Sequence, residues 1–434
     1  MIKVSIIIPS LNVVDYIEET LASVTTQSLN EIEIICVDAG STDGTWEIIN
    51  SFSKNDKRII CVQSSIKSYG YQVNEGIRLA GGEYIAILES DDYVINTMYE
   101  DLYNYAKRFD ADYVKSDYAT YSTDNDGKRV LVERVISNNP NLYEEIFSPK
   151  NVPEVVIDDW YLWNGIYKKE FITKNNILFS ESKGAAFQDI GFLHLTASNA
   201  ERVVYLKESL YRYCVDRADA SSNSGKSMKY IRYEYGRLCD YVLGKTSDIE
   251  EVMLYKRMIK SFARACAETS NEKMLNNDIV EICDWFQTQL LEAEKKGIIT
   301  NEDIPYSLRE GYKYFMYSAY GLVAYRKLRI SEFKSFIDDD KKIVVFGCGN
   351  YGKEVTKLLG LYNKNIWAYT DNNADLWGKK IDGIAIVQPN NINDNAKFIV
   401  ANEKYADRII KQISELYPKS DIFNFTSDLL FCEG

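Results

Sequence analysis

The stretch Gly82-Glu83-Tyr84-Ile85-Ala86-Ile87-Leu88-Glu89-Ser90-Asp91-Asp92-Tyr93 passes from a short apolar run into a cluster of carboxylates. Residues 84–88 favour β-structure and are too few for a helix, which predicts a buried strand of a parallel sheet. The acidic residues then lie at the carboxyl end of this strand, the end that borders the ligand crevice in open α/β sheets.

Carboxylates that crowd one strand end repel one another unless a cation joins them. Hard oxygen ligands suit Mg²⁺ or Mn²⁺, which proteins hold with one or two carboxylates and with a substrate's phosphates. The alternative is a solvated acidic turn without a ligand. The stretch alone leaves both interpretations open, and the rest of the amino-terminal third favours the metal.

The bulk composition limits the class of protein. A chain of 434 residues exceeds what one core usually supports and predicts two or three domains. The 46% apolar and 26% charged content is typical of a soluble globular protein. Because 64 acidic residues outnumber 51 basic ones, for a net charge of −13, we expect no nucleic-acid partner.

Eight cysteines without a C-x-x-C pair and a single histidine, His194, disfavour a structural zinc site and a disulfide framework. The chain opens directly into the apolar residues 4–9, without a signal-peptide pattern. No apolar run approaches the roughly 18 residues of a membrane span. The sequence therefore predicts a cytoplasmic protein.

Strand and helix patterns alternate through the first 90 residues. Strands are expected at 4–8, 32–37, 59–62 and 84–88, with helical spacing between them. We expect Pro9 to end the first strand, because proline lacks the N–H that a central ladder needs. The alternation predicts an α/β domain with a parallel, Rossmann-like sheet. Asp38 and Asp91, which both follow strands, should lie on the same rim.

Eight short motifs follow one another over residues 4–217. They are Ile6-Ile7-Ile8-Pro9-Ser10-Leu11-Asn12, Ser23-Val24-x-x-Gln27, Val37-Asp38-Ala39-Gly40-Ser41-Thr42-Asp43-Gly44-Thr45, Asn74-x-Gly76-Ile77, Glu89-Ser90-Asp91-Asp92, Trp163-Asn164-x-x-Tyr167, Gln188-Asp189-x-x-Phe192 and Leu210-Tyr211-x-Tyr213. In this order the region resembles a family 2 glycosyltransferase of the GT-A fold. Such enzymes move a sugar from a nucleotide diphosphate donor with inversion. The acidic stretch falls where that family has its metal-binding D-x-D.

The resemblance implies a role for each matching position. Asp189 stands at the place of the general base, and the metal, Mn²⁺ or Mg²⁺, falls to Asp91 and Asp92. The donor pocket implied by the resemblance comprises Pro9, Ser10, Asn12, Asp38, Asn74, Glu89, Ser90 and Asp91, with Asp38 on the uracil or other base. Substitutions at Ala39, Gly165 and Gln188, and Glu89 in place of the first acid of D-x-D, depart from the family pattern. The metal ligands among Glu89, Asp91 and Asp92 therefore stay open.

Other interpretations of these residues remain. Asp189 could only cap the helix that follows it, and His194 fits a packed structural histidine. Arg212 and Arg217 could contact phosphate. Three aromatic residues, Trp160, Tyr161 and Trp163, could stack on a sugar or pack in the core.

Residues 226–337 carry apolar positions at helical spacing and predict a helical linker or insert domain. Within them, residues 307–335 mix basic and aromatic side chains. This mixture is compatible with peripheral contact to the inner face of an anionic membrane. The alternative is an aromatic core helix with a solvated basic face.

Residues 338–434 begin a second α/β pattern. A strand at 342–346 leads into Gly347, Gly349 and Gly352 of a G-x-G-x-x-G motif, and Asp371 follows the next strand. This context predicts a small Rossmann-like domain, and the glycines at the helix start are compatible with a second nucleotide site there. A structural or homo-oligomerising module is the alternative, since about 95 residues build little more than half a dinucleotide fold.

The sequence therefore predicts three domains: GT-A catalytic 1–225, helical 226–337 and Rossmann-like 338–434. The resemblance implies a metal-dependent inverting transferase that uses a nucleotide sugar, with UDP the expected nucleotide. Its expected acceptor is a glycan or lipid-linked molecule of cell-surface polysaccharide or glycoconjugate assembly. Two rivals are a non-catalytic nucleotide-sugar-binding scaffold and a nucleotide-dependent oxidoreductase that uses the carboxyl-terminal domain.

Overall fold

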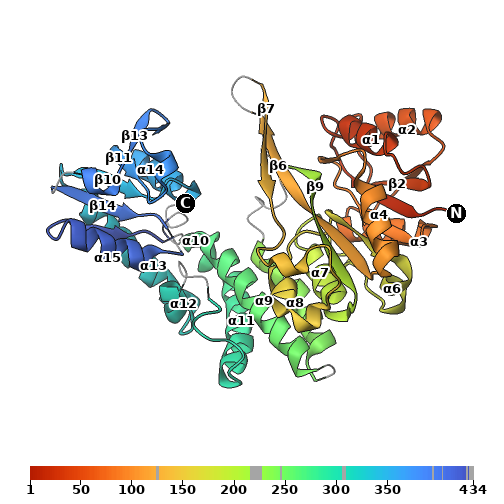
Figure 1. Ribbon diagram of the computed structural model, residues 1–434. Coiled ribbons are helices and arrows are strands. Elements are labelled where there is room, and N and C mark those ends of the chain that lie inside the picture. Colours follow the sequence, from red (N-terminus) through yellow and green to blue (C-terminus); the bar gives the residue numbers. More distant parts are fainter. Residues whose placement is uncertain are drawn as a thin grey trace. The chain divides into compact units, whose positions relative to one another are not determined.

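The computed structural model describes residues 1–123, 127–215, 227–244, 247–304, 309–392, 395–402, 404–426 and 429. The chain divides into two compact units, Met1–Arg257 and Met258–Gly434 (Figure 1). The first unit holds the predicted catalytic segment and the start of the helical segment. The second holds the remaining helices and the carboxyl-terminal sheet. The division into three domains with separate functions stays a prediction.

The described residues of the first unit form a nine-stranded sheet in the order β3-β2-β1-β4-β8-β6-β9-β5, with β7 paired to β6. The four strands β3, β2, β1 and β4 are parallel neighbours, as the alternating pattern predicted. The bounds are β1 (Val4–Ser10), β2 (Ile32–Asp38), β3 (Ile59–Gln63), β4 (Tyr84–Ile87), β5 (Tyr93–Val94), β6 (Tyr113–Thr123), β7 (Arg129–Arg134), β8 (Gly165–Lys168) and β9 (Val203–Cys214).

Helices join these strands and bury their apolar stripes. In α1, Ile17, Leu21 and Val24 recur at helical spacing and are buried. Helix α3 lies against β1 and β2, where a Cβ on Gly76 would come within 2.4 Å of Ile7 Cγ2. The helices are α1 (Ile17–Thr25), α2 (Thr45–Asn55), α3 (Tyr69–Leu79), α4 (Met98–Phe109), α5 (Pro153–Asp158), α6 (Lys169–Lys174), α7 (Asp189–Asn199), α8 (Ser227–Val242) and α9 (Asp248–Ala267).

Pro9 does not end the first strand, so that prediction is wrong. Strand β1 continues to Ser10, and Pro9 pairs in register with Val37 of β2. On its other side, β4 pairs with β1 only as far as Ile7, whose carbonyl accepts from Leu88 N–H. Because Pro9 has the same orientation as Ile7, its missing N–H faces the side where β4 has ended. The strand therefore loses no ladder hydrogen bond there.

The second unit combines helices with a second sheet, as predicted. Its helices are α10 (Asn271–Met274), α11 (Asn277–Lys295), α12 (Arg309–Phe315), α13 (Ala319–Ile337), α14 (Asn350–Leu361) and α15 (Ala406–Leu416). The six strands among its described residues follow the order β12-β13-β11-β10-β14-β15. Their bounds are β10 (Lys342–Phe346), β11 (Ile366–Thr370), β12 (Lys380–Ile381), β13 (Ile384–Val387), β14 (Ala396–Val400) and β15 (Ile422–Asn424).

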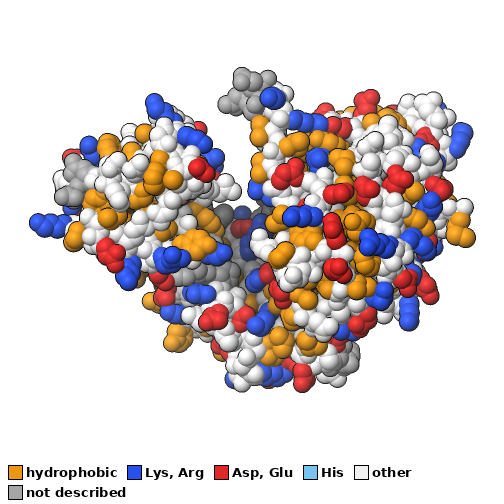
Figure 2. All heavy atoms as spheres, viewed as in Figure 1, with side chains coloured by type: hydrophobic (Ala, Val, Ile, Leu, Met, Phe, Trp, Pro, Cys, Tyr) orange, Lys and Arg blue, Asp and Glu red, His pale blue; other side chains and the backbone are white. Residues whose placement is uncertain are grey.

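The surface of the first unit carries charges of both signs. Figure 2 shows basic and acidic side chains interspersed over the visible face of the first unit. No helix in the described part of the chain has the length and apolar character needed to cross a membrane. The cysteines within the described residues form no disulfide bond.

The glycine motif of the second unit fixes a close approach of strand and helix. A Cβ on Gly352 of α14 would lie 2.0 Å from the Gly347 carbonyl oxygen, whereas a Cβ on Gly360 of the same helix would meet nothing within 4 Å. We expect Gly352→Ala to destabilise the carboxyl-terminal sheet by about 1–3 kcal/mol through overpacking. The measurement is amide hydrogen exchange of β10 and α14 in the full chain.

Gly360→Ala is the matched control for this substitution. It removes backbone freedom without a clash, and we expect it to stabilise α14 by up to about 1 kcal/mol. Equal exchange protection in the two variants would contradict the assigned packing.

Candidate active site

The acidic strand end is held from within by Asp92. Its side chain is only 2% exposed, and its carboxylate accepts hydrogen bonds from Cys214 N–H at 2.8 Å and Tyr211 O–H at 2.7 Å. Burial, and then the charge of Asp91, raise the pKa of Asp92, while these two hydrogen bonds oppose the rise. Asp92 therefore joins the loop after β4 to the end of β9.

Hydrogen bonds from three other elements hold the neighbouring backbone. The Thr20 hydroxyl of α1 donates to the carbonyls of Ser90 and Asp92, at 3.1 and 2.7 Å. The Tyr121 hydroxyl of β6 donates to the Asp91 carbonyl at 3.0 Å. The Tyr69 hydroxyl of α3 donates to the Glu89 carboxylate at 2.6 Å. Segments far apart in sequence thus converge on one acidic loop.

The predicted metal residues differ in their surroundings. Within the described residues, no group of three or more His, Cys, Asp or Glu side chains is arranged to hold a metal ion. The carboxylates of Asp92 and Glu89 bond to the protein, as described above. The pKa of Asp92 is raised by the charges of Asp91 and Glu89, so the three carboxylates act on one another. These oxygen donors fit a hard cation that takes its other ligands from a diphosphate and water.

A second cluster surrounds Asp38 at the end of β2. Asp38 is fully buried, and its Oδ1 accepts from the N–H groups of Gly40 and Ser41, at 3.0 and 2.8 Å. Its Oδ2 accepts from the hydroxyls of Ser41 and Ser10, at 2.5 and 3.3 Å. The carboxylate thus fixes the turn between β2 and α2 and ties it to β1.

The loop after β1 bonds to the same turn. Asn12 has a φ of 53°, its N–H donates to the Ser41 hydroxyl at 2.8 Å, and its Oδ1 accepts from Thr42 N–H at 2.9 Å. Pro9 and Ser10 are buried beside it, while Asn12 is exposed. The structure therefore brings Pro9, Ser10, Asn12 and Asp38 together on one rim of the sheet.

Asn74 lies in a different environment from the other expected donor residues. It is 1% exposed, and its side-chain amide donates to the Phe179 carbonyl and to Glu181, both at 3.0 Å. Its Oδ1 accepts from Phe179 N–H at 3.0 Å. These contacts tie helix α3 to the segment that precedes α7, which favours a positioning role over direct contact with a donor.

Asp189 is the first residue of α7 and is half-buried. Burial raises its pKa, while the Arg257 guanidinium and the N–H groups at the start of α7 oppose the rise. The pKa of the Tyr69 hydroxyl is raised by burial, by the Glu89 carboxylate that it contacts, and by Asp189. Tyr69 therefore lies within electrostatic reach of both carboxylates. The backbone agrees with this, because Tyr69 N–H donates to the carbonyl of Gly184, five residues before Asp189, at 2.9 Å.

Aromatic rings gather beside the acidic loop. The Trp163 ring stacks on Tyr211 with ring centroids 4.2 Å apart, and on Tyr213 at 5.1 Å. Trp163 is buried, while Tyr161 and Tyr213 are half-buried. Trp163 therefore packs in the core, and only the rim of the cluster can meet a sugar. Arg212 donates to the carbonyls of Ser209 and Tyr211 in its own strand, and Arg217 lies outside the described residues.

In the second unit, Asp371 lies beside the glycine motif, as the sequence predicted. The Asp371 carboxylate accepts from Cys348 N–H at 3.0 Å and from Asn373 N–H at 2.9 Å. Gly349 directly precedes α14 and Gly352 lies in its first turn, so Gly347, Gly349, Gly352 and Asp371 gather at the start of this helix. Both carboxylate oxygens bond to the backbone, and nucleotide binding there stays a prediction.

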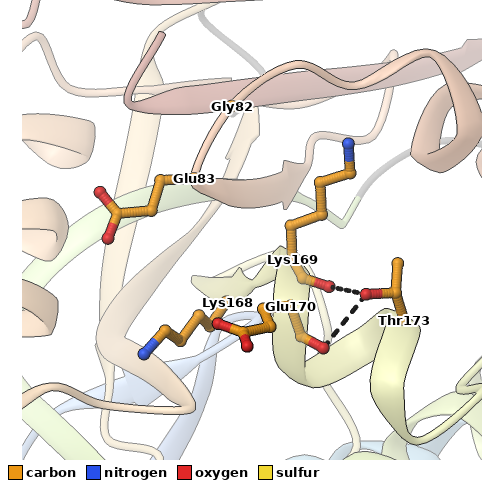
Figure 3. Close-up of a pocket in the computed structure, with 6 residues that line it drawn as sticks. All are labelled: Gly82, Glu83, Lys168, Lys169, Glu170 and Thr173. Atoms are coloured by element: carbon orange, nitrogen blue, oxygen red, sulfur yellow. Dashed lines mark hydrogen bonds between the residues drawn. The ribbon is translucent and has the colours of Figure 1, made fainter. Parts of the chain in front are cut away.

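One surface pocket of about 380 Å³ lies at the opposite end of β4. It is lined by Gly82, Glu83, Lys168, Lys169, Glu170 and Thr173, and the two lysine side chains point in different directions (Figure 3). Glu83 pairs with Lys107 at 2.8 Å, and Lys168 pairs with Asp110 at 2.7 Å. These paired charges do not converge on a ligand, so the pocket is no rival to the acidic end.

The sequence did not identify several residues that build the site. Tyr69, Thr20 and Tyr121 carry no motif of their own, since their hydroxyls act on distant backbone and carboxylate groups. Only Tyr211 lay in a quoted motif, which gave its position but not its bond to Asp92. Arg257 had no signal beyond an isolated charge within an apolar helical pattern.

Comparison with known proteins gives two family matches. A model described as Glycosyl transferase family 2 matches residues 5–170, and a model described as C2185-like, N-terminal, matches residues 339–423. EpsJ from Bacillus subtilis (strain 168), an uncharacterized glycosyltransferase, is 34% identical over 301 residues, which cover 65% of this chain and 83% of EpsJ.

A second relative carries a more specific name. WfaP from Escherichia coli, a UDP-Glc:alpha-D-GlcNAc-diphosphoundecaprenol beta-1,3-glucosyltransferase, is 31% identical over 194 residues, which cover 40% of this chain and 74% of WfaP. The crystal structure of residues 1–349 of TarS from S. aureus in complex with UDP-GlcNAc aligns with a TM-score of 0.57 at 19% identity. The alignment covers 77% of this chain and 92% of that one, and it confirms the GT-A type of fold.

The environment of Asn74 separates a positioning role from a binding role. We expect Asn74→Ala to destabilise the first unit by about 1–3 kcal/mol, because it leaves buried backbone groups of Phe179 unpaired. Donor affinity should stay within a few-fold of the native value. Chemical denaturation and titration calorimetry with UDP measure the two effects, and a large loss of UDP affinity at unchanged stability would contradict this assignment.

Proposed function

This chain belongs to glycosyltransferase family 2, and on that premise we propose that its first unit is an inverting, metal-dependent transferase of a sugar from a UDP donor. The proposal is supported by Asp38 at the end of β2, by the acidic loop after β4, and by Tyr69, which bonds to Glu89 of that loop and whose pKa is raised by burial and by the charges of Glu89 and Asp189. A catalytic transferase needs these three functions together: a base pocket, a diphosphate site and a general base.

The nucleotide pocket is proposed around Asp38. Because Asp38 accepts four hydrogen bonds from the turn and from Ser10, it orders the loops at the ends of β1 and β2. Exposed Asn12 and the backbone near Pro9 then line a site for uracil. The TarS structure named above contains UDP-GlcNAc, and this supports a uridine nucleotide for the present chain as well.

The donor diphosphate is proposed to lie at the acidic loop. A bound Mg²⁺ or Mn²⁺ would neutralise the negative charge that grows on the departing diphosphate. Asp91 is proposed as its protein ligand, with Glu89 as a neighbour oriented by Tyr69. The contacts of Asp92 to Tyr211 and Cys214 suit a residue that holds the loop, so we now propose it as a support for Asp91 and not as a ligand.

The transfer itself needs one proton acceptor. The Asp189 carboxylate is proposed to take the proton of the acceptor hydroxyl while that oxygen bonds to the anomeric carbon. The bond between that carbon and the diphosphate oxygen breaks on the opposite face, and the nucleoside diphosphate leaves with the electron pair. Configuration at the anomeric carbon is therefore inverted.

The acceptor is proposed to be a glycan or a lipid-linked sugar of the cell surface. The name of WfaP states a diphosphoundecaprenol-linked acceptor, which supports this class. Peripheral membrane contact is proposed through α12, α13 and their connection. This region exposes aromatic, apolar and basic side chains, namely Tyr317, Tyr320, Leu328, Lys313 and Lys327.

Release of nucleoside diphosphate from a panel of nucleotide sugars separates this transferase from a non-catalytic scaffold.

The role of Asp189 gives a sharp expectation. Asp189→Asn keeps the shape of the side chain and removes its basicity, so kcat should fall roughly 10²- to 10⁴-fold. Donor affinity should stay within a few-fold, because it depends on Asp38, the metal and the backbone near Pro9. Transfer kinetics and UDP titration measure both. Near-native kcat would reduce Asp189 to a helix cap.

The metal proposal has its own test. Turnover should require Mg²⁺ or Mn²⁺, and Asp91→Ala should abolish it, because the charge on the leaving diphosphate is no longer offset. The assay is nucleoside diphosphate release with and without chelator. Full activity in excess chelator would refute the metal requirement, while Glu47→Ala on the surface of α2 serves as a control that keeps native activity.

A further inference from the structure

Arg257 is a fully buried arginine near the end of the first unit. Its side chain is 0% exposed, although it carries a charge that arginine does not lose in proteins. One guanidinium nitrogen, Nη1, donates to the Val156 carbonyl of α5 at 2.5 Å. The guanidinium also lies over the Trp160 ring, 4.6 Å from its centroid. These two contacts fix the plane of the group between α5 and the aromatic residue that follows it.

The remaining nitrogens of Arg257 are unsatisfied. Among the described residues, Nε and Nη2 have no hydrogen-bond partner, and no carboxylate lies within ion-pair distance of the guanidinium. A buried charge without a counter-ion costs several kcal/mol by general experience. A fold keeps such a group only if another interaction compensates that cost. The negative group on which Arg257 acts is the Asp189 carboxylate of α7.

The packing of helices points Arg257 toward α7. Met253 and Arg257 are four residues apart on α9 and so share one face. Met253 forms a small apolar cluster with Val156 of α5 and Ala197 of α7. Arg257 bonds to Val156 itself. The face of α9 that carries Arg257 is thus turned to α5 and α7, and α7 begins at Asp189.

We propose that Arg257 is a positioning residue that holds the Asp189 carboxylate ionised and ready to accept a proton. The inference rests on the proposed role of Asp189 as the base. A nearby cation favours the charged form of a carboxylate, and the effect is larger where burial reduces screening by water. Arg257 supplies that cation without an ion pair, so the Asp189 oxygens stay available for the acceptor hydroxyl.

Other titratable groups also act on Arg257 or Asp189 from the elements packed around them. They are Tyr69 of α3, Glu234 and Arg237 of α8, His194 of α7, and the buried pair of Lys115 on β6 with Asp159. Burial lowers the pKa of His194 to about 3, so it stays neutral, and Arg257 adds to this effect. Glu234 pairs with Arg237 at 3.4 Å. Arg257 is the cation that acts on Asp189 most strongly.

The sign of the expected effect follows directly. The positive charge of Arg257 lowers the pKa of Asp189 against the rise that burial causes. Removing the charge should raise that pKa, so the base becomes protonated at a higher pH. Activity is then lost on the acid side of the profile and recovers as the pH rises.

The experiment measures kcat/KM for UDP release against pH, with whichever of UDP-glucose, UDP-galactose and UDP-GlcNAc the native chain cleaves fastest. Arg257→Gln can keep the bond to Val156 and loses the charge. We expect its acid limb to shift up by roughly one pH unit, with about a tenfold loss on the acid side and near-native rates at high pH. Arg257→Lys should restore the native limb, because it keeps the charge.

Arg326 provides the matched control. It is also 0% exposed, it bonds to the Cys266 and Thr269 carbonyls, and it belongs to the second unit. Arg326→Gln should leave the acid limb in place. A uniform loss of activity at every pH in Arg257→Gln, or an unshifted limb, would assign Arg257 a structural role only and overturn the inference.

Two further measurements separate the possible failures. If Asp189→Asn keeps native activity, the base assignment itself fails, whereas loss in Asp189→Asn with an unshifted limb in Arg257→Gln refutes only the role of Arg257. If Arg257→Gln fails to bind UDP, the proposal is tested instead by the salt dependence of the acid limb of the native enzyme. Because Arg257 is fully buried and Asp189 half-buried, salt screens their interaction little, so the acid limb of the native enzyme should not move between about 0.05 M and 0.5 M NaCl. A shift of more than about half a pH unit would contradict the proposal.

Discussion

The buried carboxylate of Asp92 is the interaction on which the geometry of the acidic loop depends. Three acidic residues crowd the end of β4, and their repulsion would open the loop if nothing opposed it. Asp92 turns inward and takes hydrogen bonds from Tyr211 and from the Cys214 backbone. A hydrogen bond to a carboxylate is worth about 1.5–3 kcal/mol. One acid is thereby used to fix the position of the other two.

The same constraint explains why the sheet has to continue beyond its parallel half. Strands β3, β2, β1 and β4 alone would present an acidic edge with no partner for Asp92. Strand β9 supplies both Tyr211 and the Cys214 N–H, and it reaches this place through β6 and β8. The chain must therefore pass about 120 residues beyond Asp92 before the loop after β4 is complete. The catalytic segment behaves as one structural unit for this reason.

The parallel strands were predictable, because each apolar run of four to seven residues is followed by a loop or helix signal within the sequence. The placement of Asp38 and Asp91 at or after strand ends was predictable from the strand pattern, while the role that motif order gives Asp189 stays a prediction. The contacts of Tyr69, Thr20 and Tyr121 were not predictable, since they join residues 20 to 72 positions apart through geometry that only the folded sheet creates. Pro9 was misjudged because its sequence does not show on which side its strand lacks a neighbour.

Asp38 and Asp92 show how similar carboxylates acquire different tasks. Asp38 accepts three hydrogen bonds from the turn beside it and one from Ser10 of β1, so its effect on a ligand acts through the loops of Asn12 and Ser41 that it orders. Asp92 accepts its hydrogen bonds from Tyr211 and Cys214 of β9. Asp189 lies at the start of α7, where burial raises its pKa and, within the described part of the chain, the buried Arg257 and the N–H groups that open this helix act against that rise. Because a carboxylate saturated with hydrogen bonds is a poor proton acceptor, the least-bonded acid of the three is the one suited to be the base.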